Sequence, residues 1–147
     1  MRVESSRFGI IEADDDAVIT FPHGLIGFES SRSWILIPDS EASQVAWLQS
    51  VTRPQVALPL VSPRRIVPDY KVSVSERQLT SLAIRSSDQI FILAIVSKSG
   101  HTLTLNLRSP IVINATRRLG AQIVSEDNLP LALPLTQSTA RTFRMAA

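Results

Sequence analysis

The segment FPHGLIGFE, from Phe21 to Glu29, constrains the fold more than any other part of the chain. Two glycines and a proline interrupt four large apolar residues. Glycine accepts positive φ angles and proline lacks a backbone donor, so neither a regular helix nor a central strand is expected here. The pattern predicts a hydrophobic turn. Its apolar side chains either close the end of a core or form a contact surface for another protein.

The size of the chain indicates one folded domain. With 147 residues, 44% of them hydrophobic, a single core is expected to bury about 70% of the surface of the unfolded chain. We assign residues 1–135 to this domain. Residues 136–147 are polar or small apart from Phe143 and Met145, which predicts a flexible C-terminal tail.

Residue types exclude several kinds of chemistry. The chain has no cysteine, so it can form no disulfide, thiolate zinc site or cysteine nucleophile. The longest apolar run, Ile90 to Val96, is much shorter than the ~20 residues that cross a bilayer. No apolar run of signal-peptide length follows Arg2 and Glu4. These features favour a cytoplasmic protein that does not bind membranes.

Short β-type runs predict most of the secondary structure. Strands are expected at 8–12, 17–21, 34–37, 45–50, 55–61, 70–74, 90–97, 102–107, 111–114, 121–124 and 131–135. One helix is expected over Glu76 to Leu82, capped by Ser75. Pro59 implies an edge position or a bulge, because proline cannot donate to a ladder. The fold class is therefore mainly β, a compact antiparallel barrel or sandwich with one short helix.

Catalytic and metal-binding patterns are missing from the sequence. There is no phosphate-binding glycine loop and no Gly-x-Ser-x-Gly elbow, and His23 and His101 fall in separate predicted loops. The acidic cluster of Glu12 and Asp14 to Asp16 is best interpreted as a solvated turn. We therefore expect no enzyme activity, no cofactor and no metal. A hydrolase that uses dispersed carboxylates is a remote alternative.

The charge of the chain leaves a second alternative open, a nucleic-acid-binding β-barrel module. The net charge is +2 and the pI is about 9.7. However, only Arg64-Arg65 and Arg117-Arg118 form adjacent basic pairs, and aromatic residues make up 5% of the chain. Modules that bind nucleic acids usually concentrate basic residues on one face and interleave them with stacking aromatics.

Four blocks of sequence, in order along nearly the whole chain, resemble one known family. These blocks are the segment from Phe21 to Glu29, the segment Trp47-Leu48-Gln49-Ser50, the segment Pro68-Asp69-Tyr70, and the segment from Asn106 to Asn114, after which Gln122 follows at the familiar distance. By these blocks the chain resembles the flagellar assembly factor FliW family.

The resemblance implies a cytoplasmic, non-enzymatic protein with a compact antiparallel β-barrel-like fold and no cofactor. It also implies two alternative protein partners, flagellin and the RNA-binding translational repressor CsrA. Binding of CsrA would antagonise repression, and binding of flagellin would compete with it, so that flagellin synthesis follows export. Direct binding of nucleic acid is not expected, and the free protein is expected to be a monomer.

The matching blocks also supply candidate partner-binding residues. The candidates are Phe21, Pro22, His23, Leu25, Ile26, Phe28, Glu29, Leu48, Gln49, Tyr70, Asn106 and Asn114. For Phe21, Leu25 and Phe28, burial in the core is an equal alternative, because large apolar side chains are usually buried. Asn106 and Asn114 have the alternative role of satisfying backbone groups at strand ends.

Overall fold

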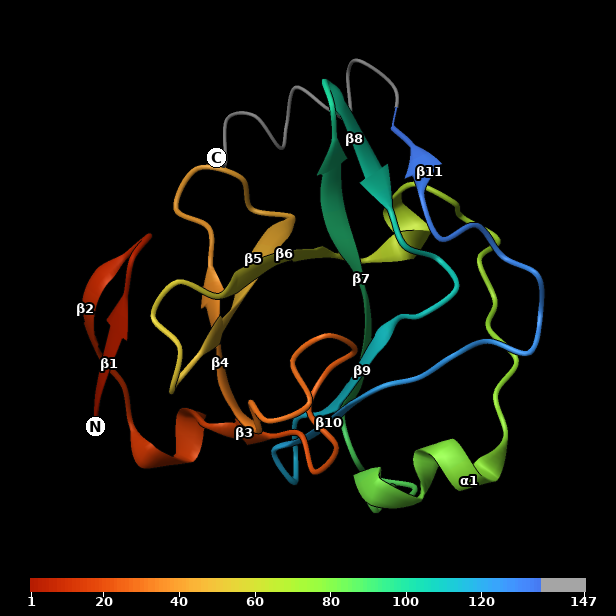
Figure 1. The fold of residues 1–147 in the computed structure, drawn as a ribbon. Coiled ribbons are helices and arrows are strands. Elements are labelled where there is room, and N and C mark those ends of the chain that lie inside the picture. The colour runs from red at the N-terminus through yellow and green to blue at the C-terminus, as the bar shows by residue number, and fades with distance from the viewer. Residues whose placement is uncertain (136–147) are drawn as a thin grey trace.

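The computed structural model describes residues 1–135, which form a closed β-barrel with one short helix (Figure 1). The strands are β1 (Arg2–Ser5), β2 (Gly9–Glu12), β3 (Ile19–Thr20), β4 (Ser33–Pro38), β5 (Val45–Ser50), β6 (Ala57–Val61), β7 (Ile90–Ser99), β8 (Thr102–Leu105), β9 (Ile111–Asn114), β10 (Leu119–Gln122) and β11 (Leu133–Pro134). The expected mainly β fold is confirmed. The predicted tail lies outside the described residues.

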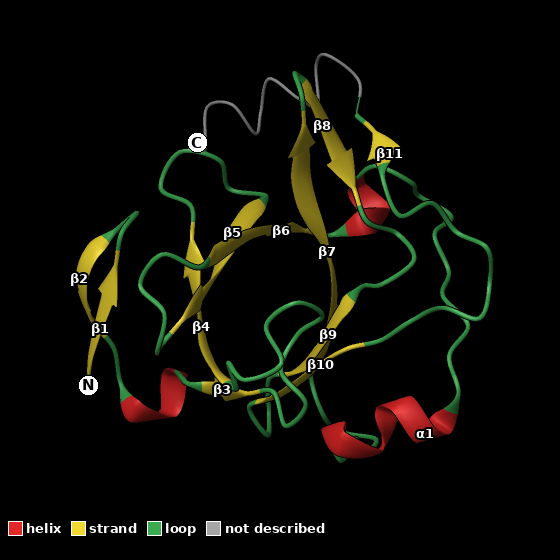
Figure 2. Ribbon diagram, viewed as in Figure 1, coloured by secondary structure: helices red, strands yellow, loops and turns green. Residues whose placement is uncertain are grey.

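The barrel wall runs in the order β3, β4, β5, β6, β7, β9 and β10 (Figure 2). All neighbouring strands are antiparallel except β10 and β3, which pair in parallel through Leu119 and Thr20 and so close the ring. The hairpin of β1 and β2 forms a separate sheet. Beyond the barrel, β8 pairs with the far end of β7, and β11 pairs with β8. Closure leaves the barrel few free strand edges.

The apolar side chains pack in three clusters. The interior cluster includes Trp34, Leu48 and Ile111 from the barrel strands, together with Phe21 and Leu25 from the turn. A second cluster contains Trp47 of β5 and Tyr70, together with buried side chains from β6, β7 and β8. A third cluster holds the helical segment against β9 and β10. This arrangement follows from the alternation of strand side chains between the two faces of the wall.

The helical segment agrees with the prediction. Helix α1 spans Glu76–Leu79, and the 3-10 helix η3 continues it over Thr80–Leu82. Ser75 occupies the N-cap position but makes no side-chain capping hydrogen bond. Leu82, fully buried, anchors the segment to the third cluster.

Three strand predictions are wrong, and the other predicted strands differ from the observed ones by at most two residues at either end. Residues 70–74 form no ladder, because Tyr70 ends a turn from Val67 and its side chain anchors the segment instead. The strand expected over 17–21 shrinks to Ile19–Thr20, since the acidic residues fold into the 3-10 helix η1 (Asp15–Ala17). Strand β1 was missed because its buried positions are Val3 and the polar Ser5, which gives no apolar alternation.

Candidate functional site

The segment from Phe21 to Glu29 folds as the predicted turn. Gly24 has φ of +65°, and a Cβ atom there would lie 2.5 Å from the carbonyl oxygen of Glu29, so both the backbone conformation and the close approach require glycine. The main chains of Leu25 and Phe28 exchange hydrogen bonds of 3.3 and 2.8 Å across the turn. The result is a small loop with a fixed shape.

The side chains of Gln122 and Glu29 hold this turn in place. The backbone N–H of Ile26 donates to Oε1 of Gln122 at 2.9 Å, and Nε2 of Gln122 donates to the carbonyl oxygen of Ser109 at 3.1 Å. The N–H of Gly27 donates to Oε1 of Glu29 at 3.2 Å. Residues almost a hundred positions apart in sequence are thereby joined at one site.

The turn divides its apolar residues between the core and the surface. Phe21 and Leu25 are buried in the barrel interior, and the half-buried ring of Phe28 packs edge-on against Trp34 with 6.3 Å between ring centroids. The side chain of Ile26 is 61% exposed at the tip of the turn. The structure therefore gives the core role to Phe21 and Leu25, and leaves Ile26 as the exposed aliphatic side chain of the turn.

A hollow borders the turn. It has a volume of 360 Å³ and lies between His23 and Gly24 of the turn, Arg77 and Gln78 of α1, and Gln122 of β10. His23 and Glu29 are exposed, and Pro22 is half-buried. The exposed face at this end of the barrel thus combines one apolar side chain with a rim of polar groups.

Three of the other candidates are buried and have structural partners. Leu48 lies in the barrel interior. Gln49 accepts a 2.7 Å hydrogen bond from Oγ of Ser5, which ties the β1–β2 hairpin to the barrel. Oη of Tyr70 donates to the carbonyl oxygen of Leu107 at 2.7 Å, and burial raises the pKa of Tyr70. These side chains present no surface to a partner in this conformation.

The two asparagines stabilise turns, as their alternative role required. Nδ2 of Asn114 donates to the carbonyl oxygen of Leu82 at 3.0 Å, and its Oδ1 accepts from the N–H of Arg117 at 3.3 Å. Asn114 is fully buried. Asn106 is half-buried, and its Oδ1 accepts from the N–H of Ser109 at 3.0 Å.

A buried carboxylate beside Asn114 was not singled out from the sequence. The side chain of Asp88 is 1% exposed and forms a 2.9 Å ion pair with Arg117. Oδ2 also accepts from Nδ2 of Asn114 and from the N–H of Arg85, each at 2.9 Å. The hydrogen bond from Asn114 holds the pKa of Asp88 below its ordinary value, against the opposing effect of burial. No local pattern could reveal this site, because Asn114 lies 26 positions away.

Residues 1–135 contain no group of three or more histidine, aspartate or glutamate side chains that could hold a metal ion. They also contain no helix long and apolar enough to cross a bilayer.

Comparison with known proteins identifies the family. Residues 2–135 match the sequence profile described as FliW protein. The flagellar assembly factor FliW of Heliobacterium modesticaldum is 36% identical over 128 residues, covering 86% of this chain and 84% of the relative. FliW 2 of Desulfotalea psychrophila is 34% identical, covering 84% and 83%. A crystal structure of the flagellar assembly factor FliW superposes with a TM-score of 0.85 at 27% identity, covering 94% of this chain and 99% of that one. The chain therefore belongs to the FliW family of flagellar assembly factors.

Proposed function

We propose that this protein is a cytoplasmic, non-enzymatic assembly factor that binds flagellin and the translational repressor CsrA as alternative partners. The observation that carries the proposal is the exposure of Ile26 on a braced turn within a sequence block typical of the family. The membership of the chain in a family of flagellar assembly factors supports it.

The physical properties of the turn suit protein binding. An exposed aliphatic side chain gains free energy when a partner buries it. The hydrogen bonds that Gln122 and Glu29 accept from Ile26 and Gly27 fix the backbone of the turn before binding, so that little conformational entropy is lost on association. His23 and Glu29 provide a polar rim around Ile26, which is the usual anatomy of an interface.

The regulatory consequence is competition for one small protein. Flagellin would occupy the factor until it is exported, and the freed factor would then draw CsrA off flagellin messenger RNA. We favour a steric or conformational mechanism for RNA release, because the charge of this chain is +2. The clustered acids that could repel RNA are Glu12 at the end of β2 and Asp14, Asp15 and Asp16 beside and within η1. Screening limits their reach to about 10 Å at ordinary salt concentrations.

Ile26→Asp tests the proposal, with Ile10→Asp as a matched control. Ile10 lies on β2 and is 59% exposed, close to the 61% of Ile26. We expect Ile26→Asp to weaken binding of flagellin, CsrA or both by at least about tenfold, as for a central interface residue. The control variant should bind normally, and both variants should unfold at the temperature of the unchanged protein.

The measurements are titration calorimetry with each purified partner and displacement of labelled leader RNA from CsrA. Normal binding by Ile26→Asp would remove the turn from the interface. Failure of the unchanged protein to bind either partner would refute the proposed function. Tight, salt-dependent binding of the leader RNA by the protein alone would favour the nucleic-acid alternative instead.

A further inference from the structure

The seam between β6 and β7 is short compared with the full length of β7. The two strands pair only through Leu60 with Ile95 and through Val61 with Ala94. Ser62 follows Val61, and Pro63 then stands opposite Ile92, at the next hydrogen-bonding position of the ladder, where proline has no N–H to donate. Its carbonyl oxygen accepts from the N–H groups of Ile66 and Val67 at 3.1 and 2.8 Å. The chain therefore turns away from β7 into the 3-10 helix η2 (Pro63–Arg65).

This early departure leaves one edge of β7 without a neighbouring strand. On its other edge, β7 pairs with β9 through residues 90–93. The N–H of Ala115 donates to the carbonyl oxygen of Gln89 at 2.9 Å, so the odd-numbered residues of β7 direct their backbone groups at β9. By the alternation of an antiparallel ladder, the backbone groups of Ile90 and Ile92 point to the open side. Within residues 1–135, no strand pairs with them there.

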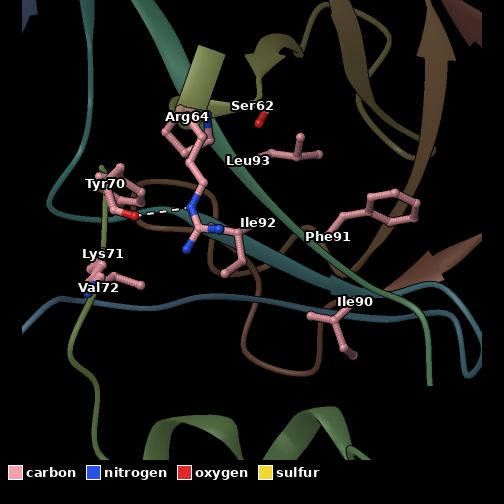
Figure 3. Close-up of a pocket in the computed structure, with 10 residues that line it drawn as sticks. Ser62, Arg64, Tyr70, Lys71, Val72, Ile90, Phe91, Ile92 and Leu93 are labelled. Atoms are coloured by element: carbon pink, nitrogen blue, oxygen red, sulfur yellow. Dashed lines mark hydrogen bonds between the residues drawn. The ribbon is translucent and has the colours of Figure 1, made fainter. Parts of the chain in front are cut away.

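A cavity of 320 Å³ lies against this open edge (Figure 3). Phe91 and Ile92 line it and are 41% and 39% exposed. Figure 3 shows Phe91 and Ile92 on opposite sides of the strand, with the side chain of Arg64 extending toward Ile92. Nε of Arg64 is held by the carbonyl oxygen of Tyr70 at 3.1 Å. Lys71 also lines the cavity, and no carboxylate does.

We propose that the open edge of β7 binds an extended segment of a protein partner, which adds a strand beside Ile90 and Ile92. The occupant would place apolar side chains on Phe91 and Ile92 and a carboxylate near Arg64 and Lys71, since the cavity carries two cations and no acidic group. Strand addition uses unpaired backbone groups for affinity and side-chain pockets for specificity. The site shares no residue with the turn from Phe21 to Glu29.

The inference rests on the proposed function only for the identity of the partner. The first probes are therefore purified flagellin and CsrA, each titrated against the unchanged protein, Ile92→Pro and Ile92→Val. Proline removes the N–H of Ile92, which faces away from β9, so the barrel ladder keeps its hydrogen bonds. Valine keeps the N–H and most of the side chain. For one partner at least, we expect Ile92→Pro to lose affinity by about tenfold or more, and Ile92→Val to bind normally.

A charge variant provides a second test that does not depend on the backbone. Arg64→Glu combined with Lys71→Glu should weaken the same partner, whereas Lys98→Glu, on the same strand outside the cavity, should not. Hydrogen exchange adds a direct readout. The amide of Ile92 should exchange freely in the isolated protein and become protected in the complex. If Ile92→Pro fails to fold, the charge variant and the exchange measurement decide.

Several results would overturn the inference. The first such result is that both partners bind, the amide of Ile92 still exchanges freely in the complexes, and neither Ile92→Pro nor the double charge variant changes the affinity. Another is protection of this amide in the isolated protein, or a dimer that Ile92→Pro dissociates, because the edge is then occupied by this chain or a second copy. If neither partner binds, the proposed function fails, and an acetylated peptide of alternating valine and aspartate becomes the probe at millimolar concentration. Protection of the Ile92 amide by this peptide, but not by a peptide in which lysine replaces aspartate, would support the edge site. Protection by neither peptide would refute it.

Discussion

Gly120→Ala probes the contact between Gly120 and Phe21, through which the turn from Phe21 to Glu29 packs into the barrel. Gly120 lies on β10, and a Cβ atom there would stand 2.3 Å from Cζ of Phe21 and 2.5 Å from its Cε1. The ring cannot swing into solvent, because Phe21 is fully buried and packs edge-on against Trp34, 6.3 Å away. Alanine at this position therefore forces the ring or the strand to move.

Two opposing effects set the size of the change. Overpacking of a well-packed core costs about 1–3 kcal/mol. Replacing glycine by alanine also restricts the unfolded chain, which stabilises the fold by about 0.4–1 kcal/mol where the backbone permits it. The clash should prevail, and we expect a net loss of about 1–2 kcal/mol. For a domain of this size, that loss lowers the melting temperature by about 3–6 °C.

A double-mutant cycle with Phe21→Leu, followed by urea denaturation, assigns the loss to this contact. Leucine is shorter than phenylalanine and vacates the space that the new methyl group needs. The double variant should therefore be more stable than the sum of the two single effects predicts, by about 1 kcal/mol. An additive cycle, or a Gly120→Ala protein more stable than the original, would show that Phe21 does not pack on Gly120 as described.

Four further predictions concern buried polar groups. Tyr70→Phe leaves the carbonyl oxygen of Leu107 unpaired and should cost about 1–3 kcal/mol in urea denaturation; a smaller change would mean that the hydrogen bond is dispensable. Since burial raises the pKa of this single tyrosine above its ordinary 10.0, its absorbance should titrate above pH 10.0 in the folded protein, and stability should fall as pH rises through that point. Asp88→Asn should destabilise the protein at neutral pH, and because the pKa of Asp88 is lowered from 3.8, the difference from the unchanged protein should shrink as pH falls below 3.8; a pH-independent difference would contradict this assignment. Gln49→Ala removes the acceptor of Ser5 and should speed hydrogen exchange across the β1–β2 hairpin while exchange at β9 stays slow; uniform acceleration would instead indicate global destabilisation.

Local sequence patterns were sufficient to predict most strands. They failed where a buried position of a strand carries a polar side chain. Apolar alternation and turn residues correctly indicated β4, β5, β7 and β9. In β1 the buried side of the strand carries Ser5, whose hydroxyl donates to Oε1 of Gln49, 44 positions away. A polar side chain buried by a distant partner leaves no trace in its own segment. The same argument explains why Asp88 was missed.

Proline illustrates what a sequence can say about an edge. Pro59 predicted an edge position or a bulge, and the ladder between β6 and β7 does begin only after it, at Leu60. The barrel nevertheless closes on both sides of β6, through β5 along its length and through β7 at its end. The missing donor of Pro59 was therefore evident from the sequence. Which strand would lie opposite Pro59 was not, because that depends on how the barrel closes.

The turn from Phe21 to Glu29 contains both buried core residues and an exposed residue within one short sequence block. Phe21 and Leu25 are buried with the barrel core, so their replacement by small residues should cost about 2–5 kcal/mol each and reduce the amount of folded protein. Ile26 stands between glycines on the same turn, and its exposed side chain contributes little to folding. A loss of partner binding after substitution at Phe21 would therefore say nothing about contact, because instability alone explains it. Only a substitution at an exposed position such as Ile26, in a protein of unchanged stability, separates the surface of this turn from its support.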